Sequence, residues 1–213
     1  MKLLSKLTVL GGLLASLLPG GEAAAAPCAP STTVGALVAC EVVVGGTTYQ
    51  IDSFSASSSI PSGSTVIIQA AGTGLAVIVV PAVGAFTAAQ VTGFFDYRLT
   101  ALGANPQLFN NVALSSTVSV FSQNGAVTVR KSFLDAQNAP FGTPLVNTGG
   151  IESAEKLEFP NVFSVHDSFT VDPTALLVSF SNTFTLVPEP ASLALLGIGL
   201  VGLGAARRRR AAS

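Results

Sequence analysis

TVSVFSQNGAVTVRK, residues 117–131, is the stretch that most clearly indicates how this 213-residue chain folds. Polar and apolar residues alternate on both sides of Asn124-Gly125, and such alternation is typical of half-buried β-strands. The Asn-Gly pair favours a two-residue type I′ turn. We therefore predict a β-hairpin with four valines on its buried face: Val118, Val120, Val127 and Val129.

The same period of two recurs along the chain. Residues 178–186 place four apolar side chains on one side (Val178, Phe180, Phe184 and Leu186), with Asn182 as the one polar residue among them. Phe95, Tyr97 and Leu99 alternate with polar residues in a third segment. Six less regular segments also favour strands: 40–44, 47–51, 65–69, 75–80, 163–166 and 168–171.

Turn signals separate these segments about every ten residues, which is typical of two-layer β-proteins. Gly72 and Gly93 fall between strand candidates and are interpreted as bends. One short helix is predicted over residues 153–158, with Ser153 as its N-cap and Glu155 in its first turn. The fold class is therefore mostly β, an antiparallel, jelly-roll-like β-sandwich that spans residues 26–187.

The N-terminal segment is typical of a cleavable secretory signal helix. Lys2 and Lys6 precede an apolar run of about a dozen residues, which is too short to span a bilayer, and small residues follow. We predict a signal peptide over residues 1–25, cut between Ala25 and Ala26 by signal peptidase after export through the general secretion machinery. A buried N-terminal helix is the alternative interpretation.

The C-terminal segment has three parts in a fixed order. Pro188-Glu189-Pro190 comes first, followed by an uncharged run over residues 191–206 and by four arginines, Arg207, Arg208, Arg209 and Arg210. Sixteen helical residues rise about 24 Å, a little less than the hydrocarbon core. The arginines stay on the cytoplasmic side and act as a basic stop-transfer signal. A buried helix with a basic cap is the alternative.

These residues resemble the PEP-CTERM sorting signal, with Pro-Glu-Pro followed by Ala191-Ser192-Leu193, a Gly/Leu-rich transmembrane helix and a basic tail. The resemblance covers residues 188–213 and says nothing of the domain before them. It implies recognition by exosortase, a membrane transpeptidase-like enzyme of Gram-negative bacteria that make exopolysaccharide. It also implies cleavage near Pro188-Glu189-Pro190, so that the inner membrane holds the chain only transiently.

The composition of the exported domain argues against several classes of function. Only 10% of the residues are charged and 49% are hydrophobic. Removal of both ends leaves four basic residues (Arg98, Arg130, Lys131 and Lys156) against nine acidic ones, a net charge of about −5. Such a domain does not attract nucleic acid electrostatically. One His and two Cys give no metal-ligand spacing, and no cofactor-binding motif is present.

Cys28 and Cys40 are the only cysteines, and both belong to the exported part. An even count in an oxidising compartment favours a disulfide, which would pin the new N-terminus near the first strand. Two free thiols or a lipid-modified Cys28 remain as alternatives, although the residues before Cys28 do not resemble a lipobox.

Catalytic patterns are weak in this sequence. His166-Asp167-Ser168 contains the residue types of a hydrolase triad, but neighbouring residues on a strand point to opposite faces. The acidic residues carry no motif that singles out a pair for glycoside hydrolysis. Sugar-binding platforms are scarce because Trp is absent and Tyr numbers two, whereas the thirteen Phe fit a core.

We therefore expect a non-enzymatic exported protein that is structural or adhesive at the cell surface or in the extracellular matrix of a biofilm. Exosortase would release it from a membrane-anchored precursor. A surface carbohydrate-binding module with exopolysaccharide as partner is the alternative, and a secreted glycoside hydrolase ranks third.

Overall fold

The computed structural model describes residues 25–83, 89–120, 125–155 and 159–186. The described part is built from β-strands, with one 3₁₀ turn at Val34–Ala36. None of these residues forms a helix long and apolar enough to cross a membrane. The predicted signal helix and the predicted span over residues 191–206 lie outside the described residues, so both stay predictions.

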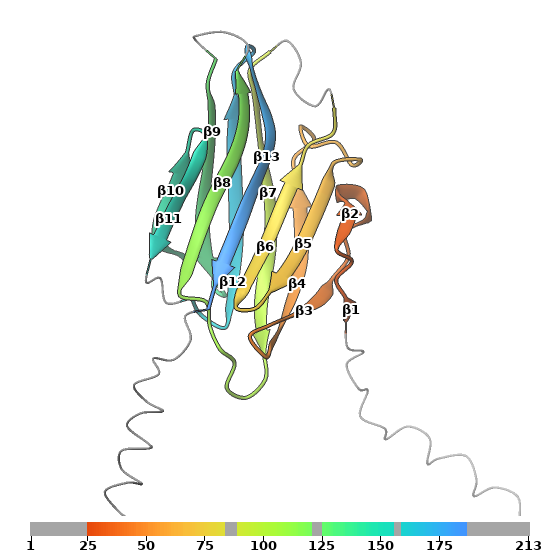
Figure 1. Ribbon diagram of the computed structural model, residues 1–213, viewed down its shortest axis with the longest axis vertical. Helices are drawn as coiled ribbons and strands as arrows, with labels where there is room; N and C mark the ends of the chain where they lie inside the picture. Colours follow the sequence, from red (N-terminus) through yellow and green to blue (C-terminus); the bar gives the residue numbers. More distant parts are fainter. Residues whose placement is uncertain (1–24, 84–88, 121–124, 156–158, 187–213) are drawn as a thin grey trace, which may run out of the picture.

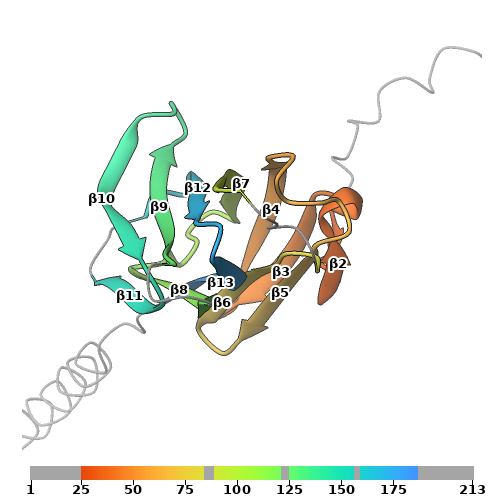
Figure 2. The same ribbon diagram turned by 90° about the horizontal axis from the view of Figure 1, so that it is seen from above.

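Two sheets face each other as layers (Figures 1 and 2). Sheet A has the order β1 (Ala26–Pro27), β3 (Cys40–Val44), β4 (Thr47–Ala56), β7 (Val91–Leu102), β12 (Val162–Val171), β9 (Val127–Asp135) and β10 (Pro140–Asn147). Sheet B has the order β11 (Gly150–Glu155), β8 (Asn111–Val120), β13 (Ala175–Thr185), β6 (Gly74–Val80), β5 (Thr65–Ala71) and β2 (Ser31–Thr33). All pairs are antiparallel except β1 with β3. The predicted mostly-β sandwich is thereby confirmed at this level.

The core between the layers comes from the alternation that the sequence shows. Phe95, Tyr97 and Leu99 point inward from β7, as predicted, and Phe180 and Phe184 do so from β13. Of the eleven phenylalanines among the described residues, eight are buried: Phe95, Phe109, Phe133, Phe159, Phe163, Phe169, Phe180 and Phe184. Burying apolar side chains of this size is the main stabilising contribution to such a fold.

The predicted hairpin at 117–131 is wrong. β8 pairs with β11 and β13 in sheet B, whereas β9 pairs with β10 and β12 in sheet A, so the chain crosses between the layers here. Gly125 is not among the residues with positive φ, which a type I′ turn requires. A Cβ on Gly125 would lie 2.7 Å from the Thr174 carbonyl oxygen, so this glycine allows a close approach of two loops. Asn124 lies outside the described residues.

The predicted helix over 153–158 is also wrong in its described part. Residues 153–155 belong to β11, which pairs with β8 through Ser153↔Ala113 and its neighbours. An open hydrogen-bonding edge on β8 therefore outweighs the local helix signal, since propensity is a weak prior against tertiary pairing. Residues 156–158 lie outside the described part. The two candidates at 163–166 and 168–171 are one continuous strand, β12.

The predictions for Gly93 and Val178 are also wrong, whereas the one for Gly72 holds. Gly93 is not a bend but lies inside β7, opposite Phe169, where an added Cβ would meet that ring at 2.3 Å. Gly72 does form the predicted turn, with φ of 58°. Val178 is exposed rather than buried because the register of β13 shifts between Leu177 and Ser179, so Leu177 takes the inward position.

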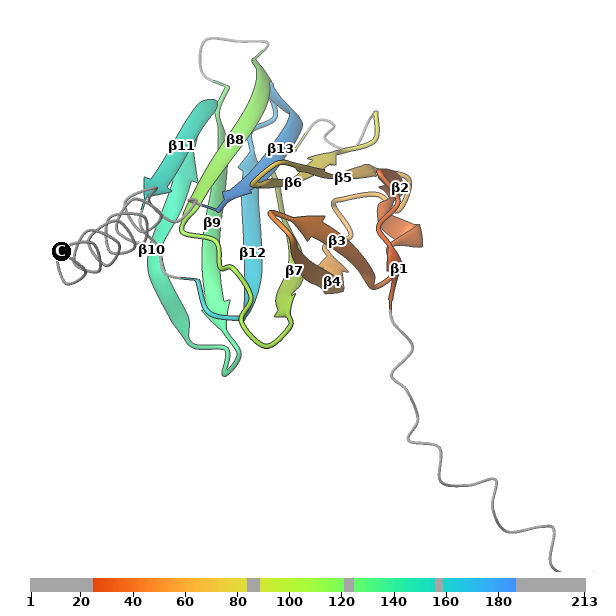
Figure 3. The same cartoon turned by 60° about the horizontal axis from the view of Figure 1, so that its bottom comes forward.

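Both ends of the described chain lie at the same end of the sandwich, the lower end in Figure 1. Figure 3 brings this end forward and shows β1 beside β3 in one layer and the end of β13 in the other. β13 is an inner strand of its sheet, flanked by β8 and β6. The chain thus leaves the domain from a strand that is hydrogen-bonded on both sides.

Candidate functional site

The exit of the chain from β13 is the first functional feature. Leu186 is buried, and its N–H donates to the Thr73 carbonyl oxygen at 2.8 Å, which fixes the last described residue on the body. The sorting residues Pro188, Glu189 and Pro190 follow two residues later and lie outside the described part, as do Arg207 to Arg210. The predicted sorting segment therefore begins directly at the end of an inner strand.

The other end of the chain is held by a covalent bond. Cys28 and Cys40 form a disulfide with Cα atoms 4.7 Å apart, as predicted. Glu41 adds two contacts: its carbonyl oxygen accepts from the Cys28 N–H at 2.8 Å and its carboxylate from the Ala25 N–H at 3.1 Å. Together these contacts place Ala26 on the edge of sheet A, while cleavage between Ala25 and Ala26 stays a prediction.

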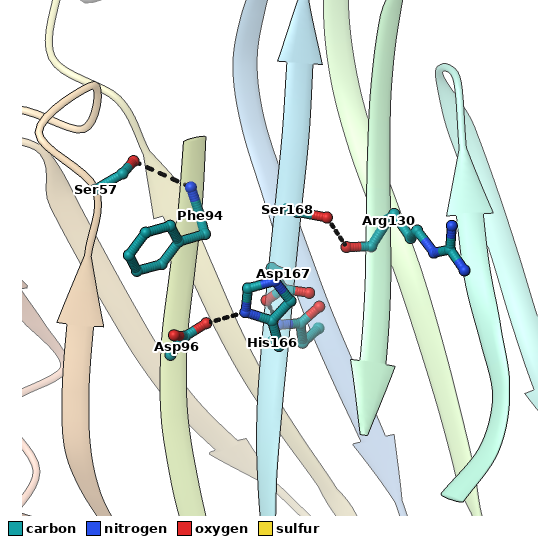
Figure 4. A network of polar contacts seen from close by, with 8 residues as sticks. Ser57, Phe94, Asp96, Arg130, His166, Asp167 and Ser168 are labelled. Carbon is teal, nitrogen blue, oxygen red and sulfur yellow. Dashed lines mark hydrogen bonds and ion pairs between the residues drawn. The ribbon is translucent and has the colours of Figure 1, made fainter. Parts of the chain in front are cut away.

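A polar group of side chains lies on the outer face of sheet A, shown in Figure 4. His166 on β12 contacts Asp96 on β7, with 2.6 Å between Nδ1 and Oδ1, because the two residues are register partners. The ring of Phe94 stacks on His166 with centroids 5.9 Å apart. Burial raises the pKa of Asp96, and the charge and hydrogen bond of His166 act in the opposite direction. We call Phe94 and His166 the outer-face ring pair.

His166, Asp167 and Ser168 do not form a hydrolase triad. His166 points outward and Asp167 points into the core, as the strand alternation predicts. Ser168 shares the outer face with His166, but its hydroxyl donates to the Arg130 carbonyl oxygen at 3.5 Å (Figure 4). The partner of His166 is Asp96, seventy positions earlier in the chain. Sequence reasoning missed this aspartate because only the pairing of β7 with β12 brings it near.

Other described carboxylates also have local partners. Asp52 accepts two hydrogen bonds from the Arg98 guanidinium, at 2.8 and 3.0 Å. Asp172 accepts from Gln90, and Asp135 accepts from two backbone N–H groups of its own turn. Among the described residues, no three His, Cys, Asp or Glu side chains are grouped as metal ligands would be.

The described surface has a hollow of about 350 Å³ with an apolar lining. It is lined by Leu108, Phe109, Asn110, Phe159 and Pro160, none of which titrates. The hollow therefore brings no acid or base to a bound molecule from these side chains.

The most unusual chemistry lies inside the sandwich. Lys131 on β9, Asp167 on β12 and Asn182 on β13 are each 0% exposed, although such polar side chains are rarely buried. Lys131 and Asp167 are register partners on adjacent strands. The Asn182 side-chain amide bridges from sheet B, donating to Asp167 and to the Tyr97 hydroxyl, the latter at 2.8 Å. We call Lys131, Asp167 and Asn182 the buried triad.

Apolar surroundings control the charge of the buried triad. The Lys131 Nζ lies 5.0 Å from the ring centroid of Phe184 and 5.7 Å from that of Phe133. Burial lowers the pKa of Lys131 to about 7, against the opposing effect of Asp167. Burial likewise raises the pKa of Asp167, mainly against the charge of Lys131 and the hydrogen bond from Asn182. Of these three residues, the sequence analysis singled out Asn182 as the polar residue on an apolar face and Asp167 only within the His166-Asp167-Ser168 pattern.

Comparison with known proteins identifies the C-terminal segment. Residues 186–210 match the family model described as the PEP-CTERM protein-sorting motif. The resemblance predicted from Pro188-Glu189-Pro190 and the arginines is therefore confirmed, and the chain carries the recognition signal of an exosortase. The match covers residues 186–210 and does not extend into the sandwich domain.

Two solved structures are remotely similar to this chain. No curated protein matches the chain. The solved structure of TmCBM61 in complex with β-1,4-galactotriose is similar at 10% identity, with a TM-score of 0.33, over 66% of this chain and 88% of that one. The enzymatically active domain of tailspike protein 4 from bacteriophage CBA120 is similar at 11% identity, with a TM-score of 0.25, over 75% of this chain and 20% of that one. Likenesses of this strength do not define a function.

Proposed function

We propose that this chain is an exported, non-enzymatic protein that exosortase sorts to the cell surface or extracellular matrix of a Gram-negative bacterium. There it serves as a structural or adhesive component of the exopolysaccharide matrix. The observation that carries the proposal is the PEP-CTERM motif at residues 186–210, which starts at the end of β13. We also propose that the sandwich is jelly-roll-like, because the chain crosses repeatedly between its two sheets.

Several features of the body support a structural role. The charged side chains of Asp52, Arg98 and Asp135 are engaged with neighbours on the domain. The disulfide and the anchored Leu186 fix both ends on the domain, so a molecule held at its C-terminus stays folded up to its attachment point. We infer that the hydrolase interpretation ranks last, because Asp96 and Asp52 already have basic partners.

Mass spectrometry of the mature protein from its native host tests the sorting proposal. The surface-exposed form should end near Pro188-Glu189-Pro190 and should lack Arg207 to Arg210. Glu189→Gln should leave an uncut, membrane-associated precursor, whereas the matched change Glu152→Gln, outside the motif, should leave processing intact. A surface-exposed form that retains the four arginines would overturn the proposal.

A sugar-binding surface is the second candidate, because the outer-face ring pair offers an aromatic side chain beside a carboxylate. Sugars bind on such surfaces through apolar ring contacts combined with hydrogen bonds. Saturable binding to exopolysaccharide should then disappear in Phe94→Ala and persist in Val43→Ala, a control that removes another outward side chain, 61% exposed, from sheet A. Absence of saturable binding in the unchanged protein would leave the structural role alone.

A further inference from the structure

The buried triad has an incomplete set of hydrogen bonds. The Lys131 Nζ, the Asp167 Oδ1 and the Asn182 Oδ1 are buried and have no hydrogen-bond partner. Among the described residues, only one other buried side-chain atom, Asn111 Oδ1, shares this state. Each unpaired buried polar atom destabilises the folded state, and the cost is larger if the atom is charged. Three such atoms on neighbouring side chains therefore call for an explanation.

A simple ion pair does not supply that explanation. No Lys131 nitrogen lies within 4.0 Å of an Asp167 oxygen, since the salt bridges of the described residues are Arg98–Asp52 and His166–Asp96. Asp167 uses its Oδ2 for the Asn182 amide instead. A pKa of about 7 for Lys131 leaves much of its amine uncharged at neutral pH. An uncharged amine in a dry, aromatic environment is a nucleophile rather than a counter-ion.

The electrophile for that amine is the side-chain amide carbon of Asn182. Phe184, whose ring lies 5.0 Å from the Lys131 Nζ, is two residues from Asn182 on the same inward face of β13. Asp167 contacts the Asn182 amide nitrogen and stands opposite Lys131 on the neighbouring strand. The amine, the carboxamide and a carboxyl group are thus held together between the two sheets.

We propose that Lys131 and Asn182 become joined by an isopeptide bond, with Asp167 as the catalytic proton carrier. The Lys131 Nζ attacks the amide carbon of Asn182 and forms the new C–N bond. Asp167 takes one proton from Nζ and delivers one to Nδ2, the C–Nδ2 bond breaks, and ammonia leaves. The products are one secondary amide and one ammonia, and Asp167 returns to its initial state. The step needs no cofactor, oxidant or second protein.

The cross-link provides hydrogen-bond partners for the buried polar atoms that lack them. The new amide carries no charge, so burial of Nζ is no longer costly. Its N–H is a donor for Asp167, and the oxygen that was Asn182 Oδ1 is an acceptor for the protonated carboxyl group. The bond joins β9 of sheet A to β13 of sheet B, which share no backbone ladder. It is therefore a covalent staple between the two layers.

Peptide mapping of the full-length chain, exported and purified with its disulfide intact, tests the proposal. Trypsin cuts after arginine and after free lysine, so a linked Lys131 resists cleavage. We expect the peptide 131–156 joined to the peptide that starts at residue 157 and contains Asn182, with a mass lower by one ammonia than the sum of the two. Fragmentation should place the branch on Lys131 and Asn182.

Variants establish the roles of the three residues. Lys131→Met and Asp167→Ala should both abolish the joined peptide, while Lys156→Met, the matched lysine control, should retain a bond between Lys131 and Asn182. If a variant fails to fold, as judged by circular dichroism, the map of the unchanged protein still decides. Ready cleavage after Lys131 together with an intact Asn182 amide would overturn the proposal. A bond from Lys131 to Asp167, recognised by loss of water instead of ammonia, would overturn it as well.

Discussion

Opening the Cys28–Cys40 disulfide is expected to cost about 3 kcal/mol of the free energy of unfolding. The bond closes a loop with a sequence separation of 12 residues, and the chain-entropy model gives about 3 kcal/mol for a loop of that size. Cys28→Ser is the substitution that opens the disulfide with the least disturbance of the core. Cys40 is only 7% exposed and keeps its side chain in the core, whereas Cys28 is partly buried beside the core.

Urea unfolding followed by circular dichroism measures this cost. With a denaturant slope of about 2 kcal/mol per molar urea, the midpoint should fall by about 1.5 M. The unchanged protein under a reductant should unfold at the same urea concentration as Cys28→Ser. A midpoint that moves by less than about 0.3 M, with an unchanged slope, would refute the assignment of stability to this loop. Free thiols in the untreated protein would refute the bond itself.

Three further results are expected. Gly93→Ala should destabilise the fold by about 1–3 kcal/mol in thermal melts, because its Cβ would lie 2.3 Å from the Phe169 ring; Gly63→Ala, with nothing within 4 Å, should leave the melting temperature unchanged. Phe159→Ala should cost about 3–5 kcal/mol in urea titrations, because this buried ring contacts Phe133, Phe163 and Phe184. Burial raises the pKa of Tyr49 to about 12 and that of Tyr97 well above its usual value, so the folded protein should show no tyrosinate absorbance near pH 10. Its stability should fall as the pH rises from about 10 to 12, because the native state retains protons that the unfolded chain loses; absorbance that titrates near pH 10 in the folded protein would contradict both statements.

The sequence predicts strands and their buried faces better than it predicts strand partners. Val127 and Val129 are buried as the period of two requires, yet their strand lies in the sheet opposite β8. A hairpin and a crossing between layers both place alternate residues toward the core, so the pattern alone does not distinguish them. Asn-Gly then favours the hairpin through local turn geometry, although the structure uses Gly125 for a close approach to Thr174.

The buried triad shows the same division between local and long-range information. Asn182 breaks an apolar face, and this local signal is visible in the sequence. Lys131 and Asp167 also interrupt apolar faces, Lys131 between Val129 and Phe133 and Asp167 between Val165 and Phe169. Nothing nearby in the chain, however, shows that β9 and β12 place these two residues opposite each other. The Asp96 partner of His166 was missed for the same reason. Contacts between distant segments depend on register, which single-sequence patterns do not encode.

The position of the isopeptide bond has a mechanical consequence for a protein held at its C-terminus. Tension that enters at Leu186 reaches Asn182 within four residues and then passes directly to Lys131, so the chain between the two linked residues bears no load. About 50 residues at about 3.5 Å each would be shielded from extension, a length of about 175 Å. Pulling single molecules by their two ends should therefore release about 175 Å more chain from Lys131→Met than from the unchanged protein. Equal lengths would show that the load passes through these strands, and hence that the two layers are not covalently joined.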